Sequence, residues 1–354
     1  MKTLGSIFLV LFSVLGLQAQ STVDLKSKVN TFVETIEADK RDLLFRDFDA
    51  PERTEWTNLP VGLAARPGIR YGDFTEKSRI AFHDLLITLL SSQGYLKVNN
   101  IMHLDDYLLE VYEIAYDKGL FDASSKAEID TLEWGHGNYY VSIWGDLESD
   151  PWSLKFEGHH VSLNITVIDE KLTMTPLFLG SDPALVRETK FAGLRSLSKE
   201  EDYGLELINM LTDEQKQKAI FSEDLPKDII TAPGAEQRLT KFQGIKGADL
   251  SEDQKEQLEF IIMEYIGSLE RDQQDYYQDL IQTTGLDEVY FGWIGGTQRV
   301  TDHYYIINSP DILIEYDNVG WIYKGDHIHT IFRDKKNDFA EDLLKKHYRT
   351  HKHE

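Results

Sequence analysis

The chain has 354 residues, enough for one large domain or two ordinary ones, and its 41% hydrophobic content excludes a disordered chain. Its 61 acidic residues outnumber 37 basic ones, and the net charge of −24 disfavours nucleic acids and anionic membrane surfaces as partners. The chain contains no cysteine, which excludes thiol catalysis, zinc ribbons, iron–sulfur clusters and disulfides.

We expect residues 1–19 to be a cleaved signal peptide. Lys2 supplies a positive charge, an apolar run over residues 4–17 follows, and Gln18-Ala19 resembles a cleavage site. The run is too short for a comfortable transmembrane helix, and no later segment is long and apolar enough to span a bilayer. The sequence therefore predicts an exported protein, periplasmic or extracellular, with no membrane insertion after signal removal. An uncleaved N-terminal anchor is the alternative.

Hydrophobic periodicity and capping signals predict the helices in chain order at 22–46, 73–94, 96–117, 198–221, 251–268, 271–284 and 338–347. Segments typical of strands lie at 139–144, 152–168, 171–179, 288–294, 303–308, 311–317 and 326–333. A turn is expected at Asp169-Glu170, and the proline and glycine residues of 226–250 predict a long connector. This order predicts an α+β fold in which amphipathic helix pairs pack on an antiparallel sheet.

The order of elements contains a weak internal repeat. The sequence Thr75-Glu-Lys-Ser-Arg resembles Ser251-Glu-Asp-Gln-Lys, and the strand that begins at Tyr139 resembles the one that begins at Val289. We therefore expect residues 20–354 to form a single domain, with two pseudo-equivalent halves, 22–225 and 250–354, that close one core. Chance similarity of two helix–strand segments is the alternative.

The densest group of polar residues lies in the strand predicted over 152–168. Side chains alternate between the faces of a strand, so Glu157 and His159 share the apolar face with Val161, whereas His160 lies on the polar face. We therefore favour His160 as a site residue. His159 remains the alternate if the apolar face forms the wall of a pocket.

A His-x-His pair occupies the strand predicted over 326–333. His327 and His329 are two residues apart and project the same way, which suits ligation of zinc, copper or iron. With His160 as third ligand they would form a metal site with an open coordination position. Arg333 lies on the same face and could hold a carboxylate or phosphate of a substrate.

Carboxylates are the expected partners of such a site. Glu315 and Asp317 share one face of the preceding strand and could serve as general base, metal ligand or orienter of a histidine. Glu157 is a second candidate for the general base. Hydrogen-bonded histidines in a buried structural network are the alternative, because a His-x-His pair alone is a weak motif.

These segments, taken together, resemble the family catalogued as domain of unknown function 3500. The resemblance covers nearly all of the mature chain and rests on Phe156–Asn164, Phe178–Pro183, Gly193–Asp202, Leu313–Asn318, His327-Ile-His329, Arg333-Asp334, Asp338-Phe339, Asp342–Leu344 and His347-Tyr348. The chain departs from the family at Val319–Gly325, where relatives tend to have a short polar stretch. The resemblance implies an extracytoplasmic globular domain and no established reaction.

The sequence thus favours an extracytoplasmic, metal-dependent enzyme, hydrolytic or oxidative, acting on a small molecule or glycan. A divalent zinc, copper or iron ion would be held by the three histidines, with Glu157 or Glu315 as base and Arg333 as anion clamp. A non-catalytic protein that binds a glycan or other small ligand in an aromatic and polar cleft is the second hypothesis. Its aromatic candidates are Trp134, Tyr139, Tyr140, Trp144 and Trp152.

Overall fold

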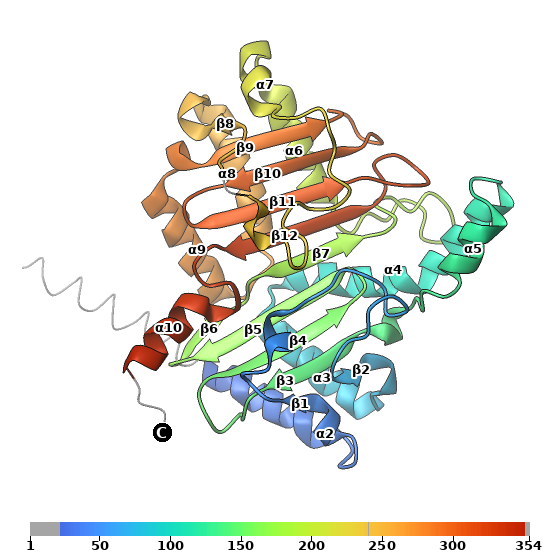
Figure 1. Ribbon diagram of the computed structural model, residues 1–354, viewed down its shortest axis with the longest axis vertical. Coiled ribbons are helices and arrows are strands. Elements are labelled where there is room, and N and C mark those ends of the chain that lie inside the picture. Colours follow the sequence, from blue (N-terminus) through green and yellow to red (C-terminus); the bar gives the residue numbers. More distant parts are fainter. Residues whose placement is uncertain (1–21, 240, 351–354) are drawn as a thin grey trace, which may run out of the picture.

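A 12-stranded sheet dominates the computed structural model, which describes residues 22–239 and 241–350 (Figure 1). The order is β1-β3-β4-β5-β7-β12-β11-β10-β9-β8, with β2 also on β3 and β6 also on β5; β1 pairs with β3 in parallel, and the other pairs are antiparallel. The strands are β1 (Phe45–Arg46), β2 (Ile69–Arg70), β3 (Tyr140–Trp144), β4 (Trp152–Gly158), β5 (Val161–Ile168), β6 (Lys171–Thr173), β7 (Leu177–Ser181), β8 (Ile245–Lys246), β9 (Tyr290–Gly295), β10 (His303–Asn308), β11 (Ile312–Asn318) and β12 (Ile328–Asp334). The predicted signal peptide lies outside the described residues.

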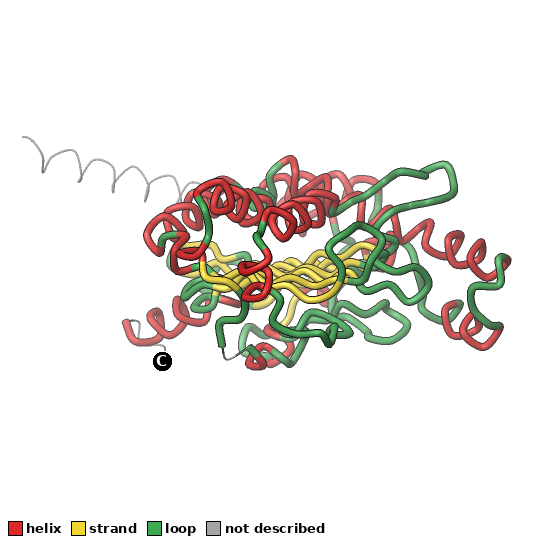
Figure 2. The backbone as a smooth tube through the Cα atoms, turned by 90° about the horizontal axis from the view of Figure 1, so that it is seen from above, coloured by secondary structure: helices red, strands yellow, loops and turns green. Residues whose placement is uncertain are grey.

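The two faces of the sheet are covered differently, as Figure 2 shows: most helices lie on one face and mostly loops on the other. Besides the helical residues 22–35, the helices are α2 (Arg41–Leu44), α3 (Glu76–Leu89), α4 (Ser92–Asp117), α5 (Ala123–Ile129), α6 (Ser198–Met210), α7 (Asp213–Ala219), α8 (Glu252–Ile266), α9 (Arg271–Thr284) and α10 (Glu341–Thr350). On the helical face, side chains such as Phe82 and Ile262 pack with sheet residues such as Leu163 and Ile314 in the main hydrophobic core. The second face carries buried polar side chains such as Asn164 and Glu315 together with smaller apolar clusters under the loops.

The expected α+β class is confirmed, and most predicted elements lie within a few residues of the observed ones. The helix predicted over 198–221 is in fact two helices, because Thr212 begins α7 with a capping box that ends the helical run at Met210. The strand predicted over 171–179 is interrupted between β6 and β7, where Pro176 offers no backbone donor.

The internal repeat of the sequence has a structural counterpart on each side of the β7–β12 pair, which lies in the middle of the sheet (Figure 1). Thr75 caps α3 and Ser251 caps α8, and each helix pair precedes a strand, β3 or β9, that is joined at its far edge by a two-residue strand. Gly68 and Gly244 both have positive φ, and a Cβ on either would lie 2.1 Å from the carbonyl oxygen of the adjacent strand. Both positions therefore require glycine.

None of the helices in residues 22–239 and 241–350 combines the length and the apolar character needed to cross a bilayer.

Candidate metal centre

A tight hairpin places the first histidine. β4 ends at Gly158 and β5 begins at Val161, so His159 and His160 form the two-residue turn, with His160 at φ +65°. The single strand predicted over 152–168 is therefore wrong. Because the turn reverses the chain, Glu157 pairs with Ser162 and shares its face, not that of Val161.

Three imidazoles converge at the end of the β7–β12 pair. The Nε2 atoms of His160 and His327 are 2.8 Å apart, and those of His327 and His329 are 3.0 Å apart. Gly180 on β7 makes room for this approach, because a Cβ there would lie 2.6 Å from the His160 ring. The structure therefore brings together the three residues that the sequence favoured as metal ligands.

The three rings differ in protonation. Burial and the neighbouring imidazoles lower the pKa of His160 and of His327 well below 6.5. Burial also opposes the charge on His329, but the Asp228 carboxylate outweighs it and raises the pKa of His329 above 6.5. Two of the rings are therefore neutral near pH 7, and their Nε2 atoms face one another.

Carboxylates orient the rings from behind. Asp228 Oδ1 lies 2.8 Å from His329 Nδ1, and His329 Nε2 therefore faces the other two rings. Asn58 donates to the second oxygen, Asp228 Oδ2, at 2.8 Å. Asp182 Oδ2 lies 3.9 Å from His327 Nδ1 and accepts a 2.5 Å hydrogen bond from the Tyr112 hydroxyl. Burial raises the pKa of Asp182 to about 6. Carboxylates behind histidines in this way are the usual outer partners of metal-bound imidazoles.

Glu315 holds the loop that carries Asp228. Its buried carboxylate accepts hydrogen bonds from the backbone N–H groups of Ile230 (2.6 Å) and Thr231 (3.0 Å), from the Thr231 hydroxyl, and from the Tyr304 hydroxyl (2.7 Å). With these donors in place it has little capacity left to accept a substrate proton. The structure thus gives Glu315 a positioning role in place of the predicted role of general base.

Asp317, on the same strand as Glu315, has fewer hydrogen-bond partners than Glu315. It is buried directly opposite His329 in the β11–β12 pair, and its Oδ2 atom has no hydrogen-bond partner among the described residues. Burial raises its pKa well above 3.8, although His329 acts in the opposite direction. Asp317 is therefore the carboxylate of this strand that still has an acceptor to offer beside the histidines.

Arg333 and Glu157 also have protein partners. The Arg333 guanidinium donates to the Thr231 carbonyl and to Asp338 Oδ2, both at 2.7 Å, and the residue is buried. Glu157 accepts from Ser162 and forms an ion pair with the buried Lys155 at 3.3 Å. Arg333 is therefore engaged mainly by protein groups, and Glu157 uses one of its two carboxylate oxygens for both of these contacts, so the anion clamp and the base at Glu157 stay predictions.

His159, the alternate ligand, belongs to a neighbouring group. Its Nδ1 atom lies 2.8 Å from Asp105 Oδ1, and its ring centre lies 3.6 Å from that of His160. The Tyr139 hydroxyl donates to the second oxygen of Asp105 at 2.8 Å. Asp105, His159 and His160 form a second group whose ligand atoms lie within 4.8 Å of one another.

Access to the three histidines is narrow. A crevice of about 20 Å³, room for about one water molecule, lies between Tyr112, Asp182, His327 and the loop over 320–323. The His327 side chain is 25% exposed, whereas His160 is buried. The covering loop belongs to Val319–Gly325, the segment in which the sequence departs from the resembled family.

The sequence did not predict the carboxylates that lie behind the histidines. Asp105, Asp182 and Asp228 lie on a helix, after a strand and in a long connector, and none is part of a recognisable motif. The aromatic side chains that the sequence offered for stacking on sugars are largely inaccessible, because Tyr139, Trp144 and Trp152 are buried. They contribute to packing and leave no open aromatic platform at those three positions.

The fold and the centre together define an α+β protein in which three histidines meet where two related half-sheets join. The chain belongs to the family described as "Protein of unknown function (DUF3500)", which matches residues 18–341. No curated protein and no solved structure matches the chain.

Proposed function

We propose that the protein is an exported, metal-dependent enzyme whose divalent ion is held by His160, His327 and His329. The observation that supports this most is the convergence of the three Nε2 atoms. A tetrahedral ion with bonds of about 2.0–2.1 Å separates its ligand nitrogens by about 3.3–3.4 Å. The two observed separations of 2.8 and 3.0 Å therefore need to widen by about 0.3–0.6 Å.

The ligand set suits catalysis better than a structural role. Three neutral imidazoles leave the charge of a divalent ion uncompensated and one coordination position open for water or substrate. A zinc ion there would activate a water molecule for hydrolysis, whereas copper or iron would favour oxidative chemistry. Substrate would approach from the side of residues 320–323, where His327 is partly exposed, which favours a small molecule or a narrow end of a larger one.

The metal site is tested by elemental analysis after dialysis against a weak chelator. We expect wild-type protein to retain about one ion per chain and His329→Ala to retain none, with both proteins folded by circular dichroism. His103→Ala is the matched control, because the His103 side chain is 64% exposed and pairs with Asp106 away from the three histidines. Near-zero metal in wild type and both variants would contradict the proposal.

Export is a separate part of the proposal and rests on the apolar run over residues 4–17 and on Gln18-Ala19. We expect the mature chain to begin at or next to Gln20. Mass analysis of the N-terminus of the protein recovered outside the cytoplasm tests this. An intact Met1 on that protein would contradict it.

A further inference from the structure

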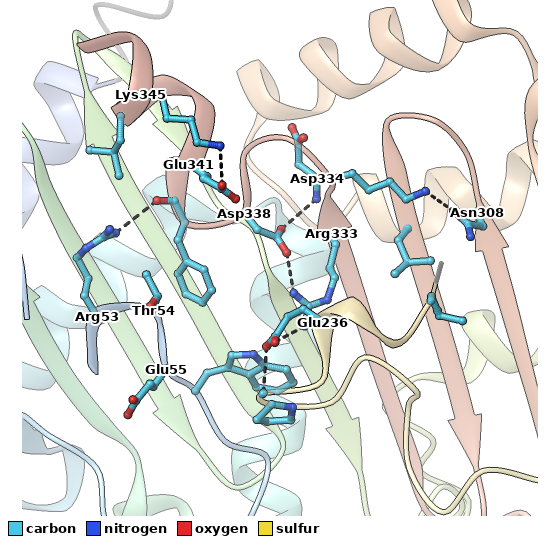
Figure 3. Close-up of a pocket in the computed structure, with 18 of the residues that line it drawn as sticks. Arg53, Thr54, Glu55, Glu236, Asn308, Arg333, Asp334, Asp338, Glu341 and Lys345 are labelled. Carbon is cyan, nitrogen blue, oxygen red and sulfur yellow. Dashed lines mark hydrogen bonds and ion pairs between the residues drawn. The ribbon is translucent and has the colours of Figure 1, made fainter. Parts of the chain in front are cut away.

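A large cavity lies on the loop-covered face of the sheet (Figure 3), and none of the three histidines lines it. Its volume is about 1160 Å³, slightly above the usual range for ligand pockets. Its lining comes from Arg53–Trp56, from the connector between Pro233 and Leu239, from Asn308 and Leu313, and from the C-terminal segment that includes Arg333–Lys335 and Tyr348. A cavity of this size accommodates a ligand of several sugar or amino-acid units.

The cavity and the metal centre are separate places on the same face. Trp56 lines the cavity and packs on Phe178 with ring centres 5.1 Å apart, and Phe178 packs on His329 at 5.4 Å. Trp56, Phe178, Ile229 and Ile331 form one buried apolar cluster. This layer of side chains divides the cavity from the histidines.

The cations that line the cavity already have partners within the protein. Arg333 is bound to Asp338 at 2.7 Å, and Lys345 to Glu341 at 2.6 Å, as Figure 3 shows. Lys335 donates to the Ser309 carbonyl at 2.6 Å. Arg53 donates to the Phe48 carbonyl at 3.0 Å. An anionic ligand would have to break these contacts in order to be bound.

The net charge of the lining also disfavours an anionic ligand. The four cations Arg53, Arg333, Lys335 and Lys345 face five carboxylates, which are Glu55, Glu236, Asp334, Asp338 and Glu341, so the lining has a net charge of 4 − 5 = −1. There is thus no excess of positive charge for a phosphate or carboxylate. A wholly apolar ligand is disfavoured too, because it would cover this ring of charges without replacing their contacts with water.

Aromatic and aliphatic side chains complete the lining. Trp56, Phe339 and Tyr348 contribute rings, and Leu239, Leu313 and Leu344 contribute aliphatic surface. A sugar ring has an apolar face of C–H groups that stacks on aromatic rings, and its hydroxyls both donate and accept hydrogen bonds. Paired carboxylates and cations offer acceptors and donors side by side, and such hydroxyls can join them without breaking the pairs.

We propose that this cavity is a binding site for a neutral oligosaccharide. The proposal does not depend on the metal centre, since the lining residues include none of the three histidines. It gives the chain a second site on the face that carries the metal centre. The sequence suggested glycan binding by the aromatic group of residues 134–152. The proposal places the glycan in this cavity instead.

The test is calorimetric titration of the full mature chain with neutral oligosaccharides of three to six units, in gluco, xylo, manno and galacto configurations. Two variants address the cavity: Tyr348→Ala removes a half-exposed ring (48% exposed), and Thr54→Trp fills the cavity from an exposed position on its wall. Trp321→Ala is the matched control, because Trp321 is 54% exposed but lies at the histidine crevice. Thermal melts verify that each variant folds.

We expect at least one neutral oligosaccharide to bind, with affinity reduced at least tenfold by Tyr348→Ala and by Thr54→Trp and unchanged by Trp321→Ala. Binding should persist after the metal is removed with a chelator, which separates this proposal from the metal-dependent function. Absence of binding across the panel would overturn the proposal. Binding that survives both cavity variants, that is lost on chelation, or that is restricted to uronic-acid or amino-sugar oligomers run in parallel would overturn it as well.

Discussion

Replacing Asp228 with asparagine tests how much the negative charge behind His329 contributes to metal binding. The Asp228 carboxylate accepts from Ile229 N–H and faces His329 Nδ1 with one oxygen, and it accepts from Asn58 with the other. In Asp228→Asn the first oxygen can stay in place, and the amide of Asn58 can rotate to accept where it now donates. The variant should therefore fold, having lost a charge but few hydrogen bonds.

The expected magnitude follows from the geometry. An ion bound at His329 Nε2 would lie about 7 Å from the Asp228 carboxylate, across the ring and the 2.8 Å hydrogen bond. At an effective dielectric constant of about 20, a divalent cation and a unit negative charge at that distance attract by about 5 kcal/mol. Because 33% of the Asp228 side chain is exposed, water screens much of this, and we expect a loss of 10- to 100-fold in affinity, about 1.4–2.7 kcal/mol.

The assay is competition for Zn²⁺ against a chromophoric chelator, which gives the dissociation constants of wild type and variant. Asp106→Asn is the matched control, because Asp106 forms a similar carboxylate–histidine pair with His136 at 2.7 Å but away from the metal centre. A change of less than about threefold in Asp228→Asn, or an equal change in both variants, would refute the outer-shell role of Asp228.

Three further predictions concern protons, the loop anchor and the body of the fold. Zn²⁺ binding at pH 6.5 should release about one proton per ion in weakly buffered solution, because the pKa of His329 is raised whereas those of His160 and His327 are lowered; three protons would contradict this. Because folding raises the pKa of His329, the charge on His329 should stabilise the metal-free fold below pH 6.5. This contribution should vanish as pH rises through the folded-state pKa of His329. Glu315→Gln should lower the free energy of unfolding by about 2–4 kcal/mol in urea titrations, since an amide cannot accept all of the hydrogen bonds that the carboxylate takes; a loss below about 1 kcal/mol would argue against the anchor. Limited proteolysis within 226–250 should leave fragments that coelute in gel filtration, because strands from both sides share the β7–β12 pair and the main core; two separately stable fragments would count against a single domain.

Much of the local structure could be predicted from residue order alone. Helices begin after capping residues such as Thr75 and Ser251. The alternation correctly places His329 and Arg333 on one face of β12, with His327 directly before the strand. These features depend on neighbours within a few positions, which is the range over which backbone geometry is set. The α+β class follows from the same local signals, taken in chain order.

The roles of the carboxylates were decided by tertiary structure. Glu315 and Asp317 have the same local pattern on one strand, yet one is saturated by the connector that carries Asp228 and the other keeps a vacant acceptor beside His329. Nothing within a few residues of either distinguishes them, because the donors come from a segment about 85 positions away. Their chemistry depends on which loop packs across them.

The turn at His159-His160 is a second feature that neighbouring residues do not predict. Alternating residues on both sides of it are typical of one continuous strand, and only the pairing of β4 with β5 shows that the chain reverses there. The reversal brings His160 to the end of β12, 167 positions away in sequence, where it meets His327. Residue types and their local spacing indicated which histidines are the candidates for a metal site, whereas their convergence, and the aspartates behind them, result from sheet pairing between distant segments.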